Sequence, residues 1–269
     1  IGMGNSVVLA GSGETDGGMT VSMSFELDSG VDTGTGTGPF DSHSVSIAHD
    51  TLGTVTVHGH GGSNAASALD TTAAGDMWDN GFGISSNDTP KAAASGDNLI
   101  VYKLPTVIDG VAVSTSYATD GEDDASSTAW GLTYTGFEGL TVNYGQGNNN
   151  ATANVDIDQT IMKATYAIGS FTLGFSDNDY KHTTSTNDQG VRSMNVAYTL
   201  SDQISLSYGE ETIEKTGKTT DIEVQGATAS YTSGGLTLSL AKLKADDVDM
   251  ASTGSNDNEY WKLGLAFAF

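Results

Sequence analysis

The stretch Met19-Thr-Val-Ser-Met-Ser-Phe-Glu-Leu-Asp28 decides the fold class of this chain. Its odd positions hold only apolar residues and its even positions hold only polar ones, which is the pattern of a β-strand with one apolar face. A helix would scatter the same apolar residues around its axis. Residues 258–269 repeat the alternation, with Trp261, Leu263 and Leu265 on one face. The sequence therefore predicts strands near both ends of the chain.

Composition alone points in another direction. The 269 residues carry 34 acidic and 10 basic side chains, for a net charge of −24, and such a charge with few large apolar residues borders on the disordered class. The regular alternation argues against disorder. The absence of cysteine excludes a disulfide scaffold and thiol or Cys-zinc chemistry, and the acidic excess excludes a nucleic-acid partner. No apolar run reaches the ~18 residues that a transmembrane helix needs.

Extending the alternation along the chain gives fifteen strand candidates. They start near Ser6, Met19, Ser42, Thr54, Asn98, Val111, Ser126, Leu140, Asp156, Phe171, Gly190, Ile204, Asp221, Leu236 and Asn258. The connections alternate between short and long. The short ones are 15–18, 50–53, 105–110, 136–139, 169–170, 201–203 and 232–235, and the long ones include 29–41, 61–97, 145–155, 177–189, 211–220 and 245–257. This order predicts an antiparallel up-and-down meander closed into a barrel.

The distribution of charged and aromatic residues indicates which solvent meets the apolar face. Charges are scarce in mid-strand, and the acids concentrate in the long connections. The aromatic residues form two rows. One lies near the short turns (Tyr102, Tyr134, Tyr166, Phe171, Tyr198, Tyr231, Phe267, Phe269), and the other near the long loops (Phe25, Tyr117, Trp130, Tyr144, Phe175, Tyr208, Trp261). Two aromatic belts around an aliphatic band are typical of a transmembrane β-barrel, which must close because lipid satisfies no strand edge.

A water-soluble sheet is the alternative, because alternation also describes a half-buried strand. The corresponding function is a secreted or surface-attached β-rich binding or adhesion protein. Partitioning separates the two, since such a protein should stay monodisperse without detergent.

Two segments resemble a known family. The terminal strand Trp261-Lys-Leu-Gly-Leu-Ala-Phe-Ala-Phe269 resembles the C-terminal signal of Gram-negative outer-membrane porins. The tract 41–60, Asp-Ser-His-Ser-Val-Ser-Ile-Ala-His-Asp-Thr-Leu-Gly-Thr-Val-Thr-Val-His-Gly-His, resembles the hairpin before the third loop of general diffusion porins, especially those of marine alphaproteobacteria. The resemblance implies a sixteen-stranded homotrimer in the bacterial outer membrane whose third loop folds inward and narrows the channel.

The strand count tests this implication. Bacterial single-chain barrels have even strand numbers, and about fifteen strands are visible here. We therefore expect residues 1–269 to be a single porin barrel domain that lacks its first N-terminal strand. With that strand restored, 61–97 becomes the third long loop and the longest one, and we expect it to fold into the pore.

The expected function is a water-filled channel for passive diffusion of small hydrophilic solutes and ions. Five acids of the third loop are candidates to line the constriction and favour cations: Asp70, Asp76, Asp79, Asp88 and Asp97. Lys163, Lys262 and Lys103 have inward parity, as does Glu26, so a transverse field across the constriction is expected. The alternative is that these lysines are solvated rim residues. Met77, Trp78 and Phe82 either stack on a solute or pin the loop to the inner wall.

Enzymatic chemistry is not expected, because the chain has no G-x-S-x-G, H-E-x-x-H, G-x-G-x-x-G or P-loop motif. His58 and His60 share a strand face about 6.6 Å apart, but a third metal ligand is missing. No cofactor is expected, except for calcium at acidic loops, where Asp246, Asp247 and Asp249 are weak candidates. Calcium could bridge such carboxylates to lipopolysaccharide phosphates, so lipopolysaccharide and outer-membrane lipid are the expected partners besides small polar solutes and cations.

Overall fold

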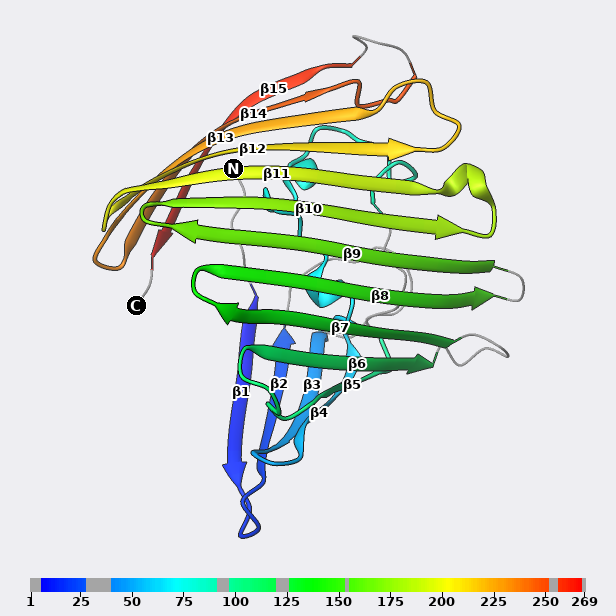
Figure 1. The fold of residues 1–269 in the computed structure, drawn as a ribbon, viewed down its shortest axis with the longest axis vertical. Coiled ribbons are helices and arrows are strands. Elements are labelled where there is room, and N and C mark those ends of the chain that lie inside the picture. The colour runs from blue at the N-terminus through cyan, green and yellow to red at the C-terminus, as the bar shows by residue number, and fades with distance from the viewer. Residues whose placement is uncertain are drawn as a thin grey trace.

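The computed structural model describes residues 6–27, 40–90, 97–119, 126–152, 155–251 and 256–267, and Asp28 and Phe269 lie outside these ranges. One antiparallel sheet contains all the described strands, each paired with its neighbours in sequence (Figure 1). The strands are β1 (Val7–Glu14), β2 (Thr20–Leu27), β3 (Phe40–His49), β4 (Gly53–His60), β5 (Leu99–Lys103), β6 (Val111–Thr119), β7 (Ser126–Phe137), β8 (Leu140–Thr152), β9 (Val155–Ile168), β10 (Phe171–His182), β11 (Gln189–Ser201), β12 (Ile204–Lys215), β13 (Ile222–Ser233), β14 (Leu236–Asp246) and β15 (Asn258–Phe267). The up-and-down meander and its fifteen strands are confirmed, and each strand starts within two residues of its predicted position.

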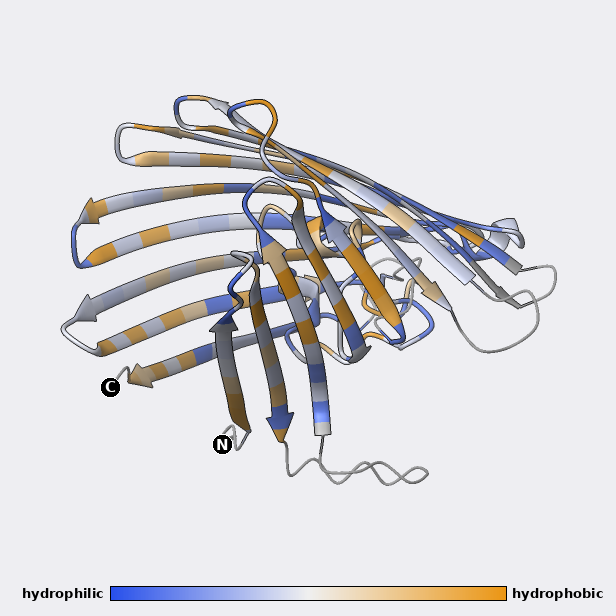
Figure 2. Ribbon diagram, turned by 90° about the horizontal axis from the view of Figure 1, so that it is seen from below, coloured by the Kyte–Doolittle hydropathy of each residue, from blue (hydrophilic) through white to orange (hydrophobic). Residues whose placement is uncertain are grey.

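The sheet curls into a shell with a convex and a concave side (Figures 1 and 2). Two short 3-10 helices, η1 (Ser67–Leu69) and η2 (Met77–Asp79), lie on the concave side, and η3 (Ser185–Asn187) joins β10 to β11. Within the described residues, β1 and β15 are the two edges of the sheet and do not pair with each other. The sixteenth strand therefore stays a prediction. No helix in the described ranges has the length and apolarity to cross a membrane.

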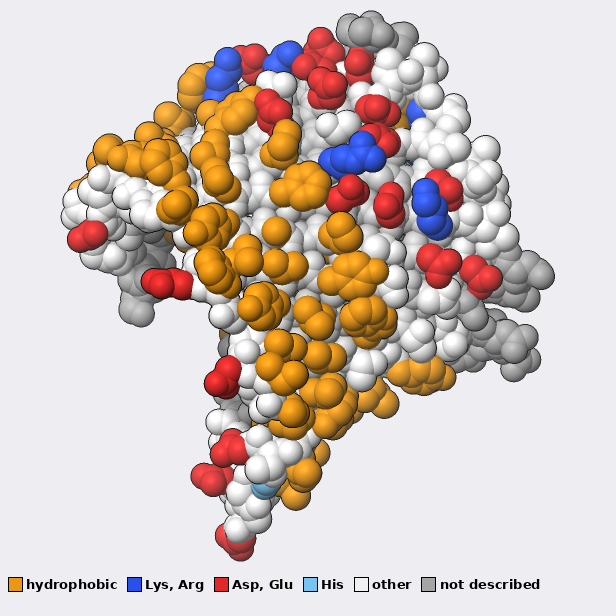
Figure 3. Space-filling view, viewed as in Figure 1, with side chains coloured by type: hydrophobic (Ala, Val, Ile, Leu, Met, Phe, Trp, Pro, Cys, Tyr) orange, Lys and Arg blue, Asp and Glu red, His pale blue; other side chains and the backbone are white. Residues whose placement is uncertain are grey.

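The convex side is apolar. Hydropathy alternates along single strands, and large apolar side chains gather in a band across their outer faces (Figures 2 and 3). Trp261 is 64% exposed and Leu263 is 71% exposed, and Met23, Ile47 and Phe175 are also exposed. A continuous apolar surface of this kind is unfavourable in water and is what lipid requires of a barrel wall.

The two aromatic rows are present at the two borders of the band. At the short-turn end, the rings of Phe171 and Tyr198 lie 4.7 Å apart on paired strands. At the long-loop end, Trp130 and Tyr144 lie 5.4 Å apart on β7 and β8. Both rows follow from the phase of the alternation, which brings the aromatic residues to the convex side.

The strands on one side of the shell extend further than the sequence pattern predicted. The apolar alternation ends near 145, 177, 211 and 245, and these positions were assigned to long loops. Strand β8 instead continues to Thr152 and β12 to Lys215, so acids such as Asp177 and Glu211 lie on strands. Backbone hydrogen bonds between strands need no apolar side chains, so pairing continues beyond the apolar band.

Candidate functional site

The loop between β4 and β5 crosses the concave side of the sheet, and residues 61–90 of it are described (Figure 2). Serine hydroxyls that alternate inward on three strands hold its backbone. Three loop N–H groups donate to them: Ala65 to Ser116 of β6 (2.9 Å), Ala73 to Ser176 of β10 (2.9 Å) and Ala74 to Ser193 of β11 (3.0 Å). The loop is therefore tied to the wall along its length rather than at its ends alone.

A buried carboxylate provides a further attachment. Glu211 of β12 is 1% exposed and points to the concave side. It accepts a hydrogen bond from the hydroxyl of Thr72 and another from the backbone N–H of Trp78 at 2.9 Å. A charged side chain is buried at low cost only when donors of this kind satisfy it. Glu211 thus orients the loop on both sides of Asp76.

Inward-facing glycines let the loop backbone approach the wall closely. A Cβ at Gly131 of β7 would lie 2.5 Å from the carbonyl oxygen of Ala65. A Cβ at Gly209 of β12 would lie 2.7 Å from the Cβ of Ala74. These positions leave room for the loop because they have no side chain.

Apolar residues of the loop pack against the upper part of the inner wall. Met77 and Phe82 are buried, and Trp78 packs against the same cluster. The wall supplies side chains of β10 to β14, together with two residues from the connection after β14: Tyr180, Val191, Ile213, Ile222, Val224, Leu243, Ala245, Val248 and Met250. The interpretation that these loop residues pin the loop to the wall is therefore confirmed.

Three of the charged candidates come together at the middle of the loop. Asp70 and Asp76 line a cavity of about 220 Å³, and Lys163 of β9 donates to the carbonyl of Thr71 at 2.8 Å. Asp76 has a left-handed backbone with φ 54° and accepts from the N–H of Thr72 at 2.9 Å. Burial, together with the negative charge of Asp76, raises the pKa of Asp70 to about 6. The loop therefore holds a carboxyl group that titrates just below neutral pH.

Two further candidates lie apart from this group. Lys262 of β15 donates to the side-chain oxygen of Asn80 at 2.8 Å, next to the exposed Asp79. Asp88 is buried and lies 3.0 Å from Lys215 and 2.8 Å from Lys218. Burial raises the pKa of Asp88, but the two ammonium groups outweigh this effect and lower it below its ordinary value. Asp88 is thus an ion-pair partner that fastens the far end of the loop.

The remaining candidates line other parts of the wall. Asp97 lies 2.7 Å from His60, at the start of β4's outgoing loop. Glu26 accepts from the hydroxyl of Ser42 at 3.2 Å on β2 and β3. Lys103 of β5 lines a cavity between the loop and the strands.

The acids proposed for calcium do not form a cluster. Asp246 lies 2.6 Å from Lys244, the N–H of Asp247 donates to Asp257 at 3.2 Å, and Asp249 accepts from Asn256 at 2.9 Å. Among the described residues, no three His, Cys, Asp or Glu side chains could hold one metal ion. Calcium binding at the acidic loops stays a prediction.

A cavity lies between the loop and the wall of β4 to β7. This cavity measures about 490 Å³, and polar and small side chains line most of it: Thr54, Thr56, Ser63, Ala65, Ala68, Leu69, Val101, Lys103, Ala112, Val113, Ser114, Gly131 and Thr133. The facing strands β1 to β3 contribute the serines Ser12, Ser22, Ser24, Ser44 and Ser46 to a second hollow. Hydroxyl-rich walls of this kind exchange hydrogen bonds readily with water and small polar solutes.

Sequence reasoning missed the residues that hold the loop in place. Glu211 was assigned to a long connection, although its parity with Gly209 on the same strand places it inward. Lys215 and Lys218 bind Asp88, and Asn258 donates to the carbonyl of Phe82 at 2.7 Å. The sequence did offer one signal for Glu211. An acidic residue at a position that faces inward is uncommon among these strands, and this could have marked Glu211 as a functional residue. The lysine and asparagine contacts had no signal in the sequence.

An antiparallel meander with an apolar convex side, and a loop tied across its concave side, define a transmembrane β-barrel channel. The family model described as Gram-negative porin matches residues 1–269, so the chain belongs to the Gram-negative porin family. It is a channel protein of the bacterial outer membrane and not an enzyme. The comparison with curated protein sequences gives no match.

Solved structures share the fold at low sequence identity. An anion-selective porin from Comamonas acidovorans has a TM-score of 0.73 at 17% identity, over 99% of this chain and 90% of that one. The trimer form of OmpT from Vibrio cholerae has a TM-score of 0.71 at 15% identity, over 97% and 90% of the two chains. Salmonella typhi OmpF, in complex with daunomycin, gives 0.71 at 11% identity, over 97% and 89%. At these identities the likeness shows the fold alone.

Proposed function

We propose that this porin conducts small hydrophilic solutes and ions by passive diffusion, and that the loop 61–97 narrows its passage. The observation that carries the proposal is the attachment of residues 61–90 to inward side chains of β6, β10, β11 and β12. A loop fixed across the concave side would reduce the open cross-section, and the cavity beside β4 to β7 supports a remaining path for solutes.

We further propose that the channel prefers cations. Residues 61–90 contain four aspartates and no lysine or arginine. Asp88 is offset by Lys215 and Lys218, whereas Asp70 and Asp76 have one nearby lysine between them, Lys163. A low-dielectric wall strengthens the field of such charges on passing ions. The Comamonas porin is anion-selective, but this does not predict which ions the present channel prefers. Ion preference depends on the side chains that line a channel, and the two chains share the fold rather than the sequence.

A planar bilayer tests both proposals. With a tenfold KCl gradient, we expect the conductance to increase in steps. We also expect the reversal potential to shift toward the equilibrium potential of K⁺, because the channel prefers K⁺ over Cl⁻. The double variant Asp70→Asn and Asp76→Asn should shift the reversal potential toward zero. Asp202→Asn, in the exposed turn before β12, is the matched control and should leave it unchanged. A wild-type reversal potential of the opposite sign would contradict cation preference, and an absence of conductance steps would contradict the channel itself.

Three proposals concern the assembly. The trimer form of OmpT supports a homotrimer for this chain. In the part of the chain that the structure describes, β1 and β15 are unpaired edges, which supports a sixteenth strand that fills the seam, because an open edge is unfavourable in lipid. Lipopolysaccharide, with or without bridging calcium, is the proposed surface partner. Gel mobility before and after boiling tests the trimer, since a stable trimer migrates more slowly until it is heated.

The alternative function, a soluble adhesion protein, has little support. Such a protein would bury its apolar faces between two layers. Here the large apolar side chains are on the convex side and exposed, while the buried cluster lies between a loop and the inner wall.

A further inference from the structure

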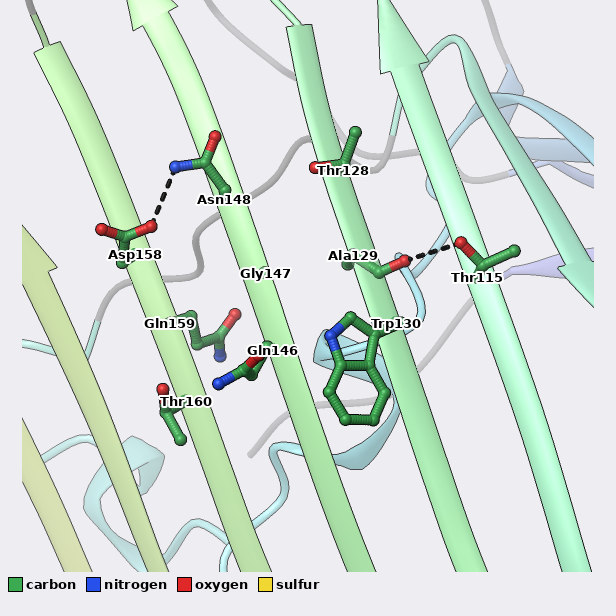
Figure 4. Close-up of a pocket in the computed structure, with 10 residues that line it drawn as sticks. All are labelled: Thr115, Thr128, Ala129, Trp130, Gln146, Gly147, Asn148, Asp158, Gln159 and Thr160. Carbon is green, nitrogen blue, oxygen red and sulfur yellow. Dashed lines mark hydrogen bonds between the residues drawn. The ribbon is translucent and has the colours of Figure 1, made fainter.

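A hollow of about 400 Å³ lies on the convex side of β6 to β9, and Figure 4 shows the residues that line it. Exposed or partly exposed side chains that alternate outward surround it, while the residues between them, such as Ala129 and Gln159, are buried. The outward members are Thr115, Thr128, Trp130, Gln146, Asn148, Asp158 and Thr160. We call this feature the outer notch. It is separate from the passage on the concave side.

The strand register arranges the outer notch in two rows. Thr115, Trp130, Gln146 and Thr160 are successive cross-strand partners and form the lower row. Tyr117, Thr128, Asn148 and Asp158 form the upper row. The next row toward the short turns consists of Val113, Leu132, Tyr144 and Met162. The hydroxyl of Tyr144 is the one polar side-chain group in this row. The border between hydrocarbon and headgroups therefore falls at the level of Trp130 and Gln146.

The notch combines an aromatic face with neutral hydrogen-bonding groups. Trp130 is 40% exposed and is held by its contact with Tyr144. The Gln146 amide donates to the hydroxyl of Tyr144 at 2.9 Å, and the Asn148 amide donates to Asp158 at 2.8 Å. Figure 4 shows Gln146 beside the Trp130 ring and the Asn148 and Asp158 pair above both. These bonds fix the side chains before any ligand arrives, which lowers the entropic cost of binding.

The neighbouring outer surface has a different character. On β10 to β12, Arg192 lies 3.5 Å from Asp177 and 2.8 Å from Glu214, in a surface crowded with charges (Figure 3). Asp158 is the single charged side chain among the residues that line the outer notch. Lys181 of β10, the cross-strand partner of Asp158, lies beside the notch and forms an ion pair with Asp188 at 3.6 Å. A phosphate group would be repelled there, whereas an uncharged polyhydroxylated ring matches both the indole face and the amide and carboxylate acceptors.

We propose that the outer notch binds the uncharged glycosyl headgroup of an outer-leaflet glycolipid. The sugar ring lies against Trp130 and exchanges hydrogen bonds with Gln146, Asn148 and Asp158. The acyl chains follow the apolar row below, through Leu132 and Met162. The ligand class follows from the indole face of Trp130 beside the hydrogen-bonding groups of Gln146 and Asn148, and its lipid origin follows from the position of the notch at the border of the apolar band.

Lipid retention measured by native mass spectrometry tests this proposal. The full-length protein is kept in neutral detergent micelles with a monoglucosyl diacylglycerol or, in a parallel arm, with phosphatidylcholine of the same chains. We expect the glycolipid to be retained at about tenfold lower concentration than phosphatidylcholine. Trp130→Leu and Gln146→Leu should each remove most of this difference. Trp261→Leu, an exposed aromatic on β15, is the matched control and should keep it.

Three outcomes would overturn the proposal. Equal retention of the two lipids in the wild type would show that the notch does not select a sugar. Binding of free methyl glucoside as strongly as the glycolipid would show that the lipid part has no role. If Trp130→Leu or Gln146→Leu converts an unheated oligomer band to monomer, while the barrel stays heat-modifiable, the notch is a subunit contact instead.

Discussion

Thr72 of the loop donates its hydroxyl hydrogen to the buried carboxylate of Glu211 on β12, 139 residues further along the chain. The same carboxylate accepts from the N–H of Trp78, so it closes the loop segment between them onto the wall. The side chain of Glu211 thus attaches the loop to strand β12. The loop position should therefore depend on Glu211.

Replacing Glu211 should release the loop. Glu211→Ala leaves the hydroxyl of Thr72 and the N–H of Trp78 without an acceptor, at a cost of about 2 kcal/mol of unfolding free energy. We expect a higher single-channel conductance and a lower midpoint in thermal unfolding. Glu211→Gln keeps an acceptor and should show smaller changes. Glu210→Ala, the neighbour on the opposite face, is the control, and an equal effect of that variant would argue against the tether.

Ion selectivity should depend on pH through Asp70. Its pKa of about 6 means that this carboxyl group is charged at pH 7.5 and protonated at pH 5. Lowering the pH across this range removes one negative charge from the loop, so the preference for K⁺ should decrease. Asp70→Asn should have the reduced preference at both pH values. Reversal potentials at the two pH values measure the effect, and a pH response that survives in Asp70→Asn would assign it to another group.

Acid should detach the far end of the loop. The pKa of Asp88 is lowered in the folded protein, so its ion pairs with Lys215 and Lys218 stabilise the fold above the unfolded pKa of about 3.9. This stabilisation is lost as the pH falls through the lower folded value. Asp88→Asn should unfold more easily at pH 7, by about 3 kcal/mol, and should lack this acid-dependent loss. Urea unfolding between pH 7 and pH 3 measures both, and Asp109→Asn in the β5–β6 turn is the control.

A single methyl group on the inner wall should move the loop. Gly209→Ala places a Cβ 2.7 Å from that of Ala74, so the loop must shift away from the wall and toward the passage. We expect a lower single-channel conductance. Gly13→Ala on β1 is the matched control, because nothing lies within 4 Å of its added Cβ. If both variants conduct like the wild type, the loop is not in contact with Gly209 in the membrane.

Much of the fold was predictable because a lipid-facing strand must alternate. The alternation of apolar and polar residues in β2 and β15 is sufficient to predict lipid-facing strands. Glycines predict the short connections near Gly18 and Gly139, both of which have positive φ. The upper ends of the strands were not predictable in this way. Beyond the apolar band, residues such as Asp177 and Glu214 lie on paired strands, and their side chains carry no signal that distinguishes a strand from a loop.

The candidate site was predictable as a region but not as a set of contacts. Loop length and acid content pointed to Asp70 and Asp76, which do lie near Lys163. The same criteria gave Asp88 the same role, although it is an ion-pair partner of Lys215. Such pairings join residues that are far apart in the sequence, and the curvature of the sheet brings them together.

The buried apolar cluster of Met77, Phe82 and the inner wall has a consequence for any attempt to redesign the channel. The loop that we propose to narrow the channel is also part of this packed cluster, so it contributes to folding as well. Widening the aperture by trimming Phe82 or Met77 would trade permeability against thermal resistance. Variants that change only side chains lining the cavity, such as Lys103 or Thr54, should alter permeability without lowering thermal stability.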